Sequence, residues 1–469
     1  MQQLSGLDAA FLYLESPQTP MHVGGVYLFA GPARANRFDF RAFRTHLAAR
    51  LDTARTFRQR LLPVPLNLDH PYWIEDRDFD LDAHLSHQVL AKPGHWEDLL
   101  TLAERLFSRP LDRQRPLWEM SFVEGLDGIA VGKKGSFALI VKVHHAAVDG
   151  LSGTEMIWAL LDPKPLPGKR HEAKPWQPGQ PPSTLNLLSR TALRTVEQPF
   201  ILAKLAGQIA RGAVQLVQEK ILHRTPLPPL PLMAPGTRFN GPVTAERILR
   251  AIVLPLNKVQ TIRKMIAKAT VNDVVLAICS GALRRYLEAH HELPEQSLVA
   301  AVPIAMRSRD CWQDMGNQVS TMLVSLATDE SDPCKRFQLI HDSARHARRD
   351  YQAIRLDRFS DLIPSTLTPP ISRLYYRMGL ARWLKPVFNL FITNVPGPQQ
   401  PLYLGNARLL YHLGMAPICD GLGLILVVTS YLDTLVISVT SCPSILPDPD
   451  VFSDHLQESF AELDAMAAG

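Results

Sequence analysis

The chain has 469 residues, of which 46% are hydrophobic and 20% are charged, and its formal net charge is +5. This length predicts two packed lobes, and the apolar fraction excludes a mainly disordered or fibrous protein. A charge excess this small, spread over so long a chain, gives no indication of nucleic-acid binding. No run of eighteen apolar residues occurs, so we expect no conventional transmembrane helix.

Strands and helices alternate in the first third of the chain. Hydrophobic periodicity predicts strands over residues 23–30, 118–123 and 137–143, and helices over residues 40–51, 99–107 and 150–161. Trp118, Met120 and Phe122 alternate onto one face of the second strand. The third strand is a largely apolar run with β-branched residues, which is typical of the centre of a sheet.

Proline residues divide the chain. Seven of the 38 prolines fall within residues 163–182 and five within residues 226–235, where neither a helix nor a central strand can persist. We therefore predict an N-terminal lobe over residues 1–162, a linker over residues 163–241 and a C-terminal lobe over residues 242–469.

Two basic and apolar segments are open to two interpretations each. Residues 185–222 predict two helices broken at Pro199, which either clamp the lobes together or lie on anionic lipid. Residues 370–390 mix aromatic and basic side chains, which suits either a lipid interface or an ordinary contact between lobes.

The C-terminal lobe continues the alternation of strands and helices. Strands are predicted over residues 245–255, 298–303, 321–327, 388–394, 422–431 and 434–440, and helices over residues 256–269 and 272–290. Asp273 is well placed near the positive N-terminus of the second helix. Strands interleaved with helices in both lobes predict an α/β fold with mixed sheets.

Cysteine usage and the N-terminus bear on the compartment. The five cysteines lie far apart in the C-terminal half and form no Cys-x-x-Cys pair, so neither a zinc site nor a disulfide framework is indicated. We expect reduced and mostly buried thiols in a cytosolic protein. The first fifteen residues carry Asp8 and Glu15 and no basic cluster, so we expect no signal peptide there.

One segment combines residues that can carry chemistry. The buried strand that starts at Phe137 ends in His144-His145, and Asp149-Gly150 follows after a short turn. A neutral imidazole is well suited to proton abstraction near pH 7. Since adjacent residues on a strand point to opposite sides, only one of the two histidines can face a cleft. Asp149 could orient the turn, and Gly150 lets the backbone close tightly.

Two other readings of this segment remain open. Both histidines could be core residues that end a strand. A metal site formed by His144, His145 and Asp149 is disfavoured because adjacent histidines diverge and the sequence offers no third ligand at a usual spacing.

His-His-x-x-x-Asp-Gly resembles the signature of coenzyme-A-dependent acyltransferases of the chloramphenicol acetyltransferase and condensation-domain fold. The surrounding sequence is similar to the bacterial bifunctional wax ester synthase/diacylglycerol acyltransferase family over nearly the whole chain. The segments that carry this resemblance are residues 4–12, 20–24, 115–118, 272–284, 302–307, 316–317, 394–398 and 429–431.

The resemblance implies two acyltransferase lobes, each a mixed sheet flanked by helices, joined by a helical linker, with the site in a channel between them. It assigns the general base to His145 in a direct transfer from acyl-CoA to a fatty alcohol or diacylglycerol, and Asp149 would shape the loop at the site rather than relay protons. It places Gly150, His144 and Asn272 around the substrate, with a plain helix cap as the alternative for Asn272. Trp118 and Arg307 would support the site.

The same resemblance implies acyl-CoA as co-substrate, with no metal and no other cofactor, and no covalent intermediate. The sequence contains no Gly-x-Ser-x-Gly elbow that would supply a nucleophile. We expect a cytoplasmic protein that associates peripherally with the inner membrane or lipid inclusions. Acceptor preference, chain-length preference and oligomeric state do not follow from the sequence.

Two other functions compete with this one. A condensation-type transferase would join a carrier-bound acyl group to another acceptor, and the segments 20–22 and 272–283 argue against it. A catalytically inactive lipid-droplet coat or lipid-binding protein would need no base, so the intact His145, Asp149 and Gly150 disfavour that reading.

Overall fold

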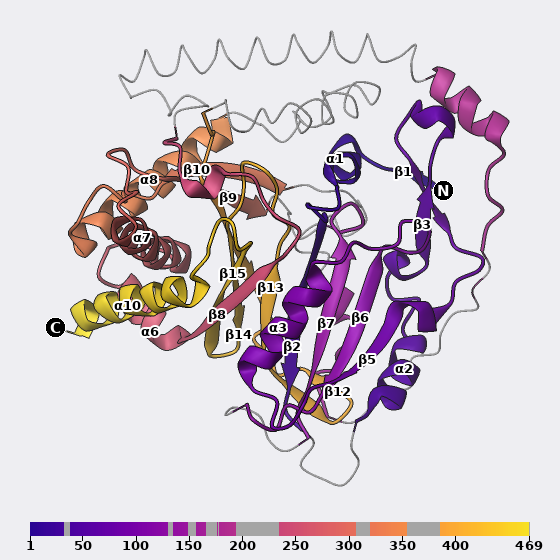
Figure 1. Cartoon of the computed structure of the whole chain (residues 1–469), viewed down its shortest axis with the longest axis horizontal. Coiled ribbons are helices and arrows are strands. Elements are labelled where there is room, and N and C mark those ends of the chain that lie inside the picture. The colour runs from indigo at the N-terminus through magenta and orange to yellow at the C-terminus, as the bar shows by residue number, and fades with distance from the viewer. Residues whose placement is uncertain are drawn as a thin grey trace.

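The computed structural model describes residues 1–31, 38–129, 135–148, 156–165, 176, 178–193, 234–305, 319–353 and 385–468. Within these ranges it contains two six-stranded mixed sheets and one small sheet (Figure 1). The predicted α/β class with mixed sheets is therefore confirmed. Most of the predicted linker, residues 354–384 and the predicted helix over residues 150–161 up to residue 155 lie outside the described residues.

The first sheet has the order β12-β13-β2-β7-β6-β5, and only the β5–β6 pair is parallel. Its strands are β2 (His22–Phe29), β5 (Leu85–Val89), β6 (Trp118–Glu124), β7 (Phe137–His144), β12 (Tyr403–Leu404) and β13 (Ala407–Met415). Trp118, Met120 and Phe122 all enter one core cluster, as their alternation predicts. The predicted strands of this lobe are thus confirmed, with bounds shifted by a residue or two.

The second sheet has the order β10-β9-β11-β14-β15-β8, with β11 parallel to both of its neighbours. Its strands are β8 (Ile248–Pro255), β9 (Val299–Ala305), β10 (Val319–Ser325), β11 (Leu390–Pro396), β14 (Ile425–Tyr431) and β15 (Thr434–Ser441). A third sheet of β1 (Gln2–Gln3), β4 (Tyr72–Glu75) and β3 (Gln59–Leu62) lies at the far side of the first lobe.

Helices cover both large sheets (Figure 1). They are α1 (Gly6–Leu14), α2 (Phe40–Ala48), α3 (Trp96–Phe107), α6 (Leu256–Arg263), α7 (Val271–Ala289), α8 (Pro333–Ala353) and α10 (Pro449–Ala468). The predicted helix over residues 256–269 ends early, at Arg263. The core of the second lobe is built on α7, which begins with a capping box between Thr270 and Asp273.

A segment of the C-terminal half of the chain completes the sheet of the first lobe. Although β12 and β13 follow β11 of the second sheet in the chain, β13 pairs with β2 of the first sheet. The hydroxyl of Thr429, on β14, donates to the backbone carbonyl of His412, on β13, at 2.9 Å. The division at residue 242 stays a prediction. It assigns β13 to the C-terminal lobe, although β13 pairs with β2 of the first sheet, and a pairing so distant in sequence could not be predicted from local patterns.

Candidate active site

The site is built at the end of a central strand. Every residue of β7 is buried, and the strand pairs with β2 on one side and β6 on the other. Beyond the last strand pair, the backbone N–H of His144 donates to Leu117 at 2.9 Å, and that of His145 donates to Met21 at 2.8 Å. Both neighbouring segments therefore fix the backbone of the histidine pair.

The two histidines point to different environments, as the strand geometry predicts. His144 is completely buried, and it lies opposite His22 in the register of β2 and β7. His145 is partly exposed, and its ring stacks on Phe11 of α1 with a centroid separation of 3.9 Å and an interplanar angle of 9°. Of the two histidines, only His145 is partly exposed to solvent.

The ring nitrogens of His144 face the protein interior. The Nδ1 atom accepts a hydrogen bond from the backbone N–H of Ala146 at 3.0 Å, so a neutral ring carries its proton on Nε2. The Nε2 atom lies 3.6 Å from Oε1 of Glu15, an electrostatic contact slightly longer than a hydrogen bond. His144 thus shapes the turn that follows β7.

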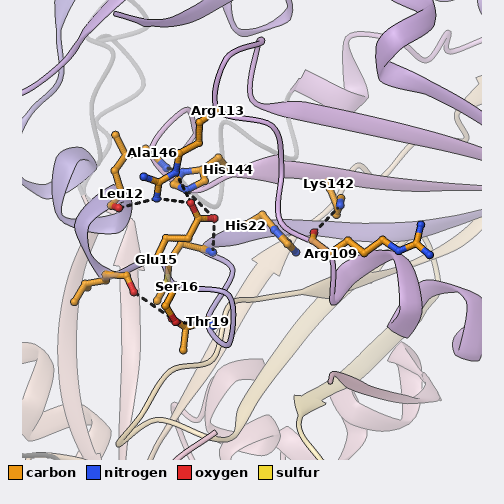
Figure 2. A network of polar contacts seen from close by, with 12 residues as sticks. Leu12, Glu15, Ser16, Thr19, His22, Arg109, Arg113, Lys142, His144 and Ala146 are labelled. Carbon is orange, nitrogen blue, oxygen red and sulfur yellow. Dashed lines mark hydrogen bonds and ion pairs between the residues drawn. The ribbon is translucent and has the colours of Figure 1, made fainter. Parts of the chain in front are cut away.

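Glu15 connects this turn to the N-terminal segment (Figure 2). The chain turns out of α1 at Glu15, and its carboxylate contacts the guanidinium of Arg113 through both Nε and Nη2. Arg113 also donates to the carbonyl of Leu12 at 2.7 Å. Burial raises the pKa of Glu15, but His144 and Arg113 outweigh burial and lower that pKa to about 2. The carboxylate is therefore ionised near neutral pH.

A second polar cluster, on the same face of β7 as His144, anchors the strand to α3 (Figure 2). The ammonium group of Lys142 is buried and donates to the carbonyls of Leu106 and Arg109 at 3.1 and 2.9 Å. Burial lowers the pKa of Lys142, and Glu119, at 2.9 Å, opposes that shift. These bonds satisfy carbonyls at the end of α3, where a cation is favoured.

His22 belongs to the same cluster. Its Nε2 lies 2.6 Å from the carbonyl oxygen of Phe107 at the C-terminus of α3. Burial and the charge of Lys142 lower the pKa of His22 well below its usual value. Its bond to the helix end gives His22 a structural role beside the turn that follows β7.

The structure places the remaining predicted residues as follows. Asp149, Gly150 and Arg307 lie outside the described residues. Trp118 is buried, and its indole N–H donates to the carbonyl of Phe57 at 3.1 Å. Asn272 is the second residue of α7 and partly exposed. Its alternative reading as a helix cap is wrong, because the cap is formed by the neighbouring residues Thr270 and Asp273.

Three residues of the site were not predicted from sequence: Phe11, Glu15 and Arg113. Phe11 lies within a segment that carries the family resemblance, yet nothing in its spacing indicates a contact with residue 145. The Glu15–Arg113 pair joins positions 98 residues apart, so no local pattern indicates it.

Among the described residues, no group of three or more His, Cys, Asp or Glu side chains is arranged to hold a metal ion. None of the described helices is long and apolar enough to cross a bilayer.

Family models match both parts of the chain. The model for the wax ester synthase/diacylglycerol acyltransferase catalytic domain matches residues 4–275, and that for the corresponding C-terminal domain matches residues 315–464. The chain belongs to this wax ester synthase/diacylglycerol acyltransferase family. It is therefore an acyl-CoA-dependent O-acyltransferase, as the resemblance implied.

Relatives of known name align over almost the whole chain. The O-acyltransferase WSD of Acinetobacter baylyi is 31% identical over 481 residues, which cover 100% of this chain and 98% of that protein. A relative from Mycobacterium tuberculosis H37Rv, named for diacylglycerol O-acyltransferase activity, is 36% identical over 98% of this chain and 99% of its own length.

Solved structures agree with the family assignment. The family enzyme from Marinobacter aquaeolei VT8 matches with a TM-score of 0.71 and 30% identity, covering 100% of both chains. The starter condensation domain of rhizomide synthetase, solved with C8-CoA and Leu-SNAC, matches with a TM-score of 0.60 over 100% of this chain and 94% of that one. At 14% identity the second match shows only that the two-lobed fold is shared.

Proposed function

We propose that this acyltransferase family member moves a long fatty acyl chain from acyl-CoA to a fatty alcohol or diacylglycerol, with His145 as the general base. The observation that carries this assignment is the difference between the two histidines. His145 is partly exposed at the end of β7, whereas His144 is completely buried with Nδ1 bonded to Ala146. A general base must reach the proton that it removes.

The transfer balances in one displacement. The imidazole of His145 takes the proton of the acceptor hydroxyl while the oxygen attacks the thioester carbonyl carbon. The carbon–sulfur bond then breaks, and the departing sulfur takes the proton from His145 to give free coenzyme A. The products are a wax ester or triacylglycerol and coenzyme A, with no covalent acyl-enzyme and no further cofactor required.

The remaining predicted site residues receive supporting roles in this proposal. Asp149 orients the turn, and Gly150 lets it close against the substrate. His144 supports the site through the hydrogen bond to Ala146 rather than through proton transfer. Phe11, stacked flat on the imidazole of His145, limits the orientations that this ring can adopt. Asn272 is proposed as a residue of the substrate channel.

The lobe division and the cellular location also belong to the proposal. We place the N-terminal lobe at residues 1–162, the linker at residues 163–241 and the C-terminal lobe at residues 242–469. The strands β12 and β13 are the exception, because they come from the C-terminal range but belong to the sheet of the first lobe. The acceptors are poorly soluble in water, so we place the enzyme in the cytoplasm, at the surface of the inner membrane or of lipid inclusions.

The direct mechanism is tested by coenzyme A release without an acceptor. Purified enzyme is mixed with palmitoyl-CoA alone, and free thiol and intact protein mass are measured. We expect no stoichiometric burst of thiol and no protein adduct, and then turnover when hexadecanol or diacylglycerol is added. A burst of one thiol per enzyme with an acylated protein would overturn the direct transfer.

A competition assay identifies the acceptor that the enzyme prefers. Hexadecanol and diacylglycerol are supplied together with palmitoyl-CoA and no carrier protein, and both esters are quantified. Turnover with free acyl-CoA is expected. A strict requirement for an acyl carrier protein would instead identify a condensation-type enzyme.

A further inference from the structure

An exposed turn in the small sheet presents leucine side chains to water. Residues 63–71 connect β3 to β4, and within them the side chains of Leu66 and Leu68 are 88% and 42% exposed. Leu66 has a φ of 57°, a left-handed conformation that a large apolar residue rarely adopts. The turn therefore combines a strained backbone with a fully presented leucine.

A second chain segment adds exposed leucines beside this turn. The helix over residues 184–193 exposes Leu185 at 77% and Leu193 at 69%. On its other side Leu187 is buried in a cluster with Val64 of the turn and with Tyr72, the first residue of β4. Figure 1 shows this helix in magenta next to β1 and β3, at the end of the first lobe farthest from α10.

The charge of both segments restricts what can cover them. The one acid of the turn over residues 63–71, Asp69, is buried, and residues 183–193 contain a single charged side chain, the exposed Arg190. Within these two segments, a protein partner with a charged rim would find Arg190 as the one exposed counter-charge. An apolar surface that carries a single arginine suits lipid, where the leucines enter the acyl boundary and the guanidinium stays among the head-group phosphates.

The surface is also connected to the catalytic turn. Leu12 of α1 packs in one cluster with Leu61 of β3, Trp73 of β4 and Ala146, which follows the histidine pair. Phe11, on the same helix, stacks on His145. The small sheet thus lies between the exposed leucines and the site.

We infer that Leu66, Leu68, Leu185 and Leu193 form a docking surface, the leucine surface, that inserts into the head-group boundary of a phospholipid layer. The inference deepens the proposed function, because an enzyme that takes insoluble acceptors must meet the lipid that holds them. Each leucine that leaves water contributes roughly a factor of ten to the partition coefficient.

Vesicle flotation tests the leucine surface. The full-length protein is mixed with phosphatidylcholine vesicles, with and without phosphatidylglycerol, and the bound fraction is measured. Wild-type protein is expected to float with both, and Leu66→Asp and Leu185→Asp are each expected to lower the partition coefficient by about tenfold or more. Leu339→Asp, at an exposed leucine on α8 of the other lobe, is the matched control and leaves flotation unchanged.

Leu66→Gly separates docking from folding. Glycine adopts the left-handed conformation without strain, so this variant keeps or raises the melting temperature while it lowers vesicle binding. A misfolded variant would lose both its cooperative melting transition and its vesicle binding. Equal flotation of wild type, Leu66→Asp and Leu185→Asp overturns the inference. It is also overturned if these variants change from dimer to monomer while their vesicle binding stays unchanged, because the surface would then be an interface between copies of the chain.

Activity measurements keep this inference distinct from the proposed function. The leucine variants should retain wild-type rates with palmitoyl-CoA and a short, water-soluble alcohol, and lose rate only with diacylglycerol in vesicles. If wild-type protein binds vesicles but transfers no acyl group to either acceptor, the proposed function fails while the docking surface stands. If Leu66→Asp loses rate equally with both acceptors, the surface is not specific to lipid.

Discussion

Replacing Glu15 by glutamine removes the carboxylate charge that lies between His144 and Arg113. The pKa of this carboxyl falls from 4.5 to about 2 on folding, which corresponds to about 3 kcal/mol of stabilisation of the ionised form. The side chain is only 7% exposed, so water screens these interactions little. We therefore expect Glu15→Gln to lower the free energy of unfolding at pH 7 by up to about 3 kcal/mol.

The pH dependence identifies the cause of this loss. Because the folded pKa lies below the unfolded one, the stabilisation is complete above about pH 5 and is lost as the pH falls towards 2. Between pH 7 and pH 3.5 the difference between wild type and Glu15→Gln should shrink by about 1.4 kcal/mol. Urea unfolding at both pH values measures it, with the exposed Glu295→Gln as a control for the change in net charge. A difference that does not change with pH would refute the reasoning.

Three further predictions concern the lobes. Burial lowers the pKa of His412 to about 4, and its ring nitrogens have no hydrogen-bond partner among the described residues, so wild type should lose about 2 kcal/mol between pH 7 and pH 5 in urea unfolding. His412→Phe should remove that loss, and an unchanged pH slope would contradict the assignment. A Cβ at Gly397 would lie 2.1 Å from the carbonyl oxygen of Ser430, so Gly397→Ala should lower the melting temperature by several degrees, whereas an unchanged melting curve would contradict this. Thr270→Val removes the hydroxyl that caps α7 through the N–H of Asp273, and calorimetry should show a loss of about 1 kcal/mol, with Thr270→Ser close to wild type.

Local patterns were sufficient for most of the central strands. The apolar run before His144 predicted β7, although the buried Lys142 within it requires carbonyls of α3 that no local pattern reveals. The position of Asp273 near a positive helix end was confirmed by its place in the capping box of α7. Such features depend on residues a few positions apart, which is why periodicity and capping rules capture them.

Non-local contacts were beyond the reach of these rules. No strand was predicted over residues 407–415, because apolar residues there are interrupted by glycine and by His412, and because the partner strand β2 lies almost 400 residues earlier. The helices α8 and α10 were also not predicted. For the site, the strand geometry correctly predicted that the two histidines diverge, whereas the ion pair of Glu15 with Arg113 depends on the folded arrangement of α1.

The central claim is that His145, and not His144, removes the proton of the acceptor. The decisive measurement compares the rates of purified His145→Ala and His144→Ala with palmitoyl-CoA and hexadecanol, after circular dichroism has shown that both variants are folded. We predict a loss of about 10²–10⁴ in kcat for His145→Ala and a smaller loss for His144→Ala. Esterification by His145→Ala at the wild-type rate, or equal losses in the two variants, would contradict the account.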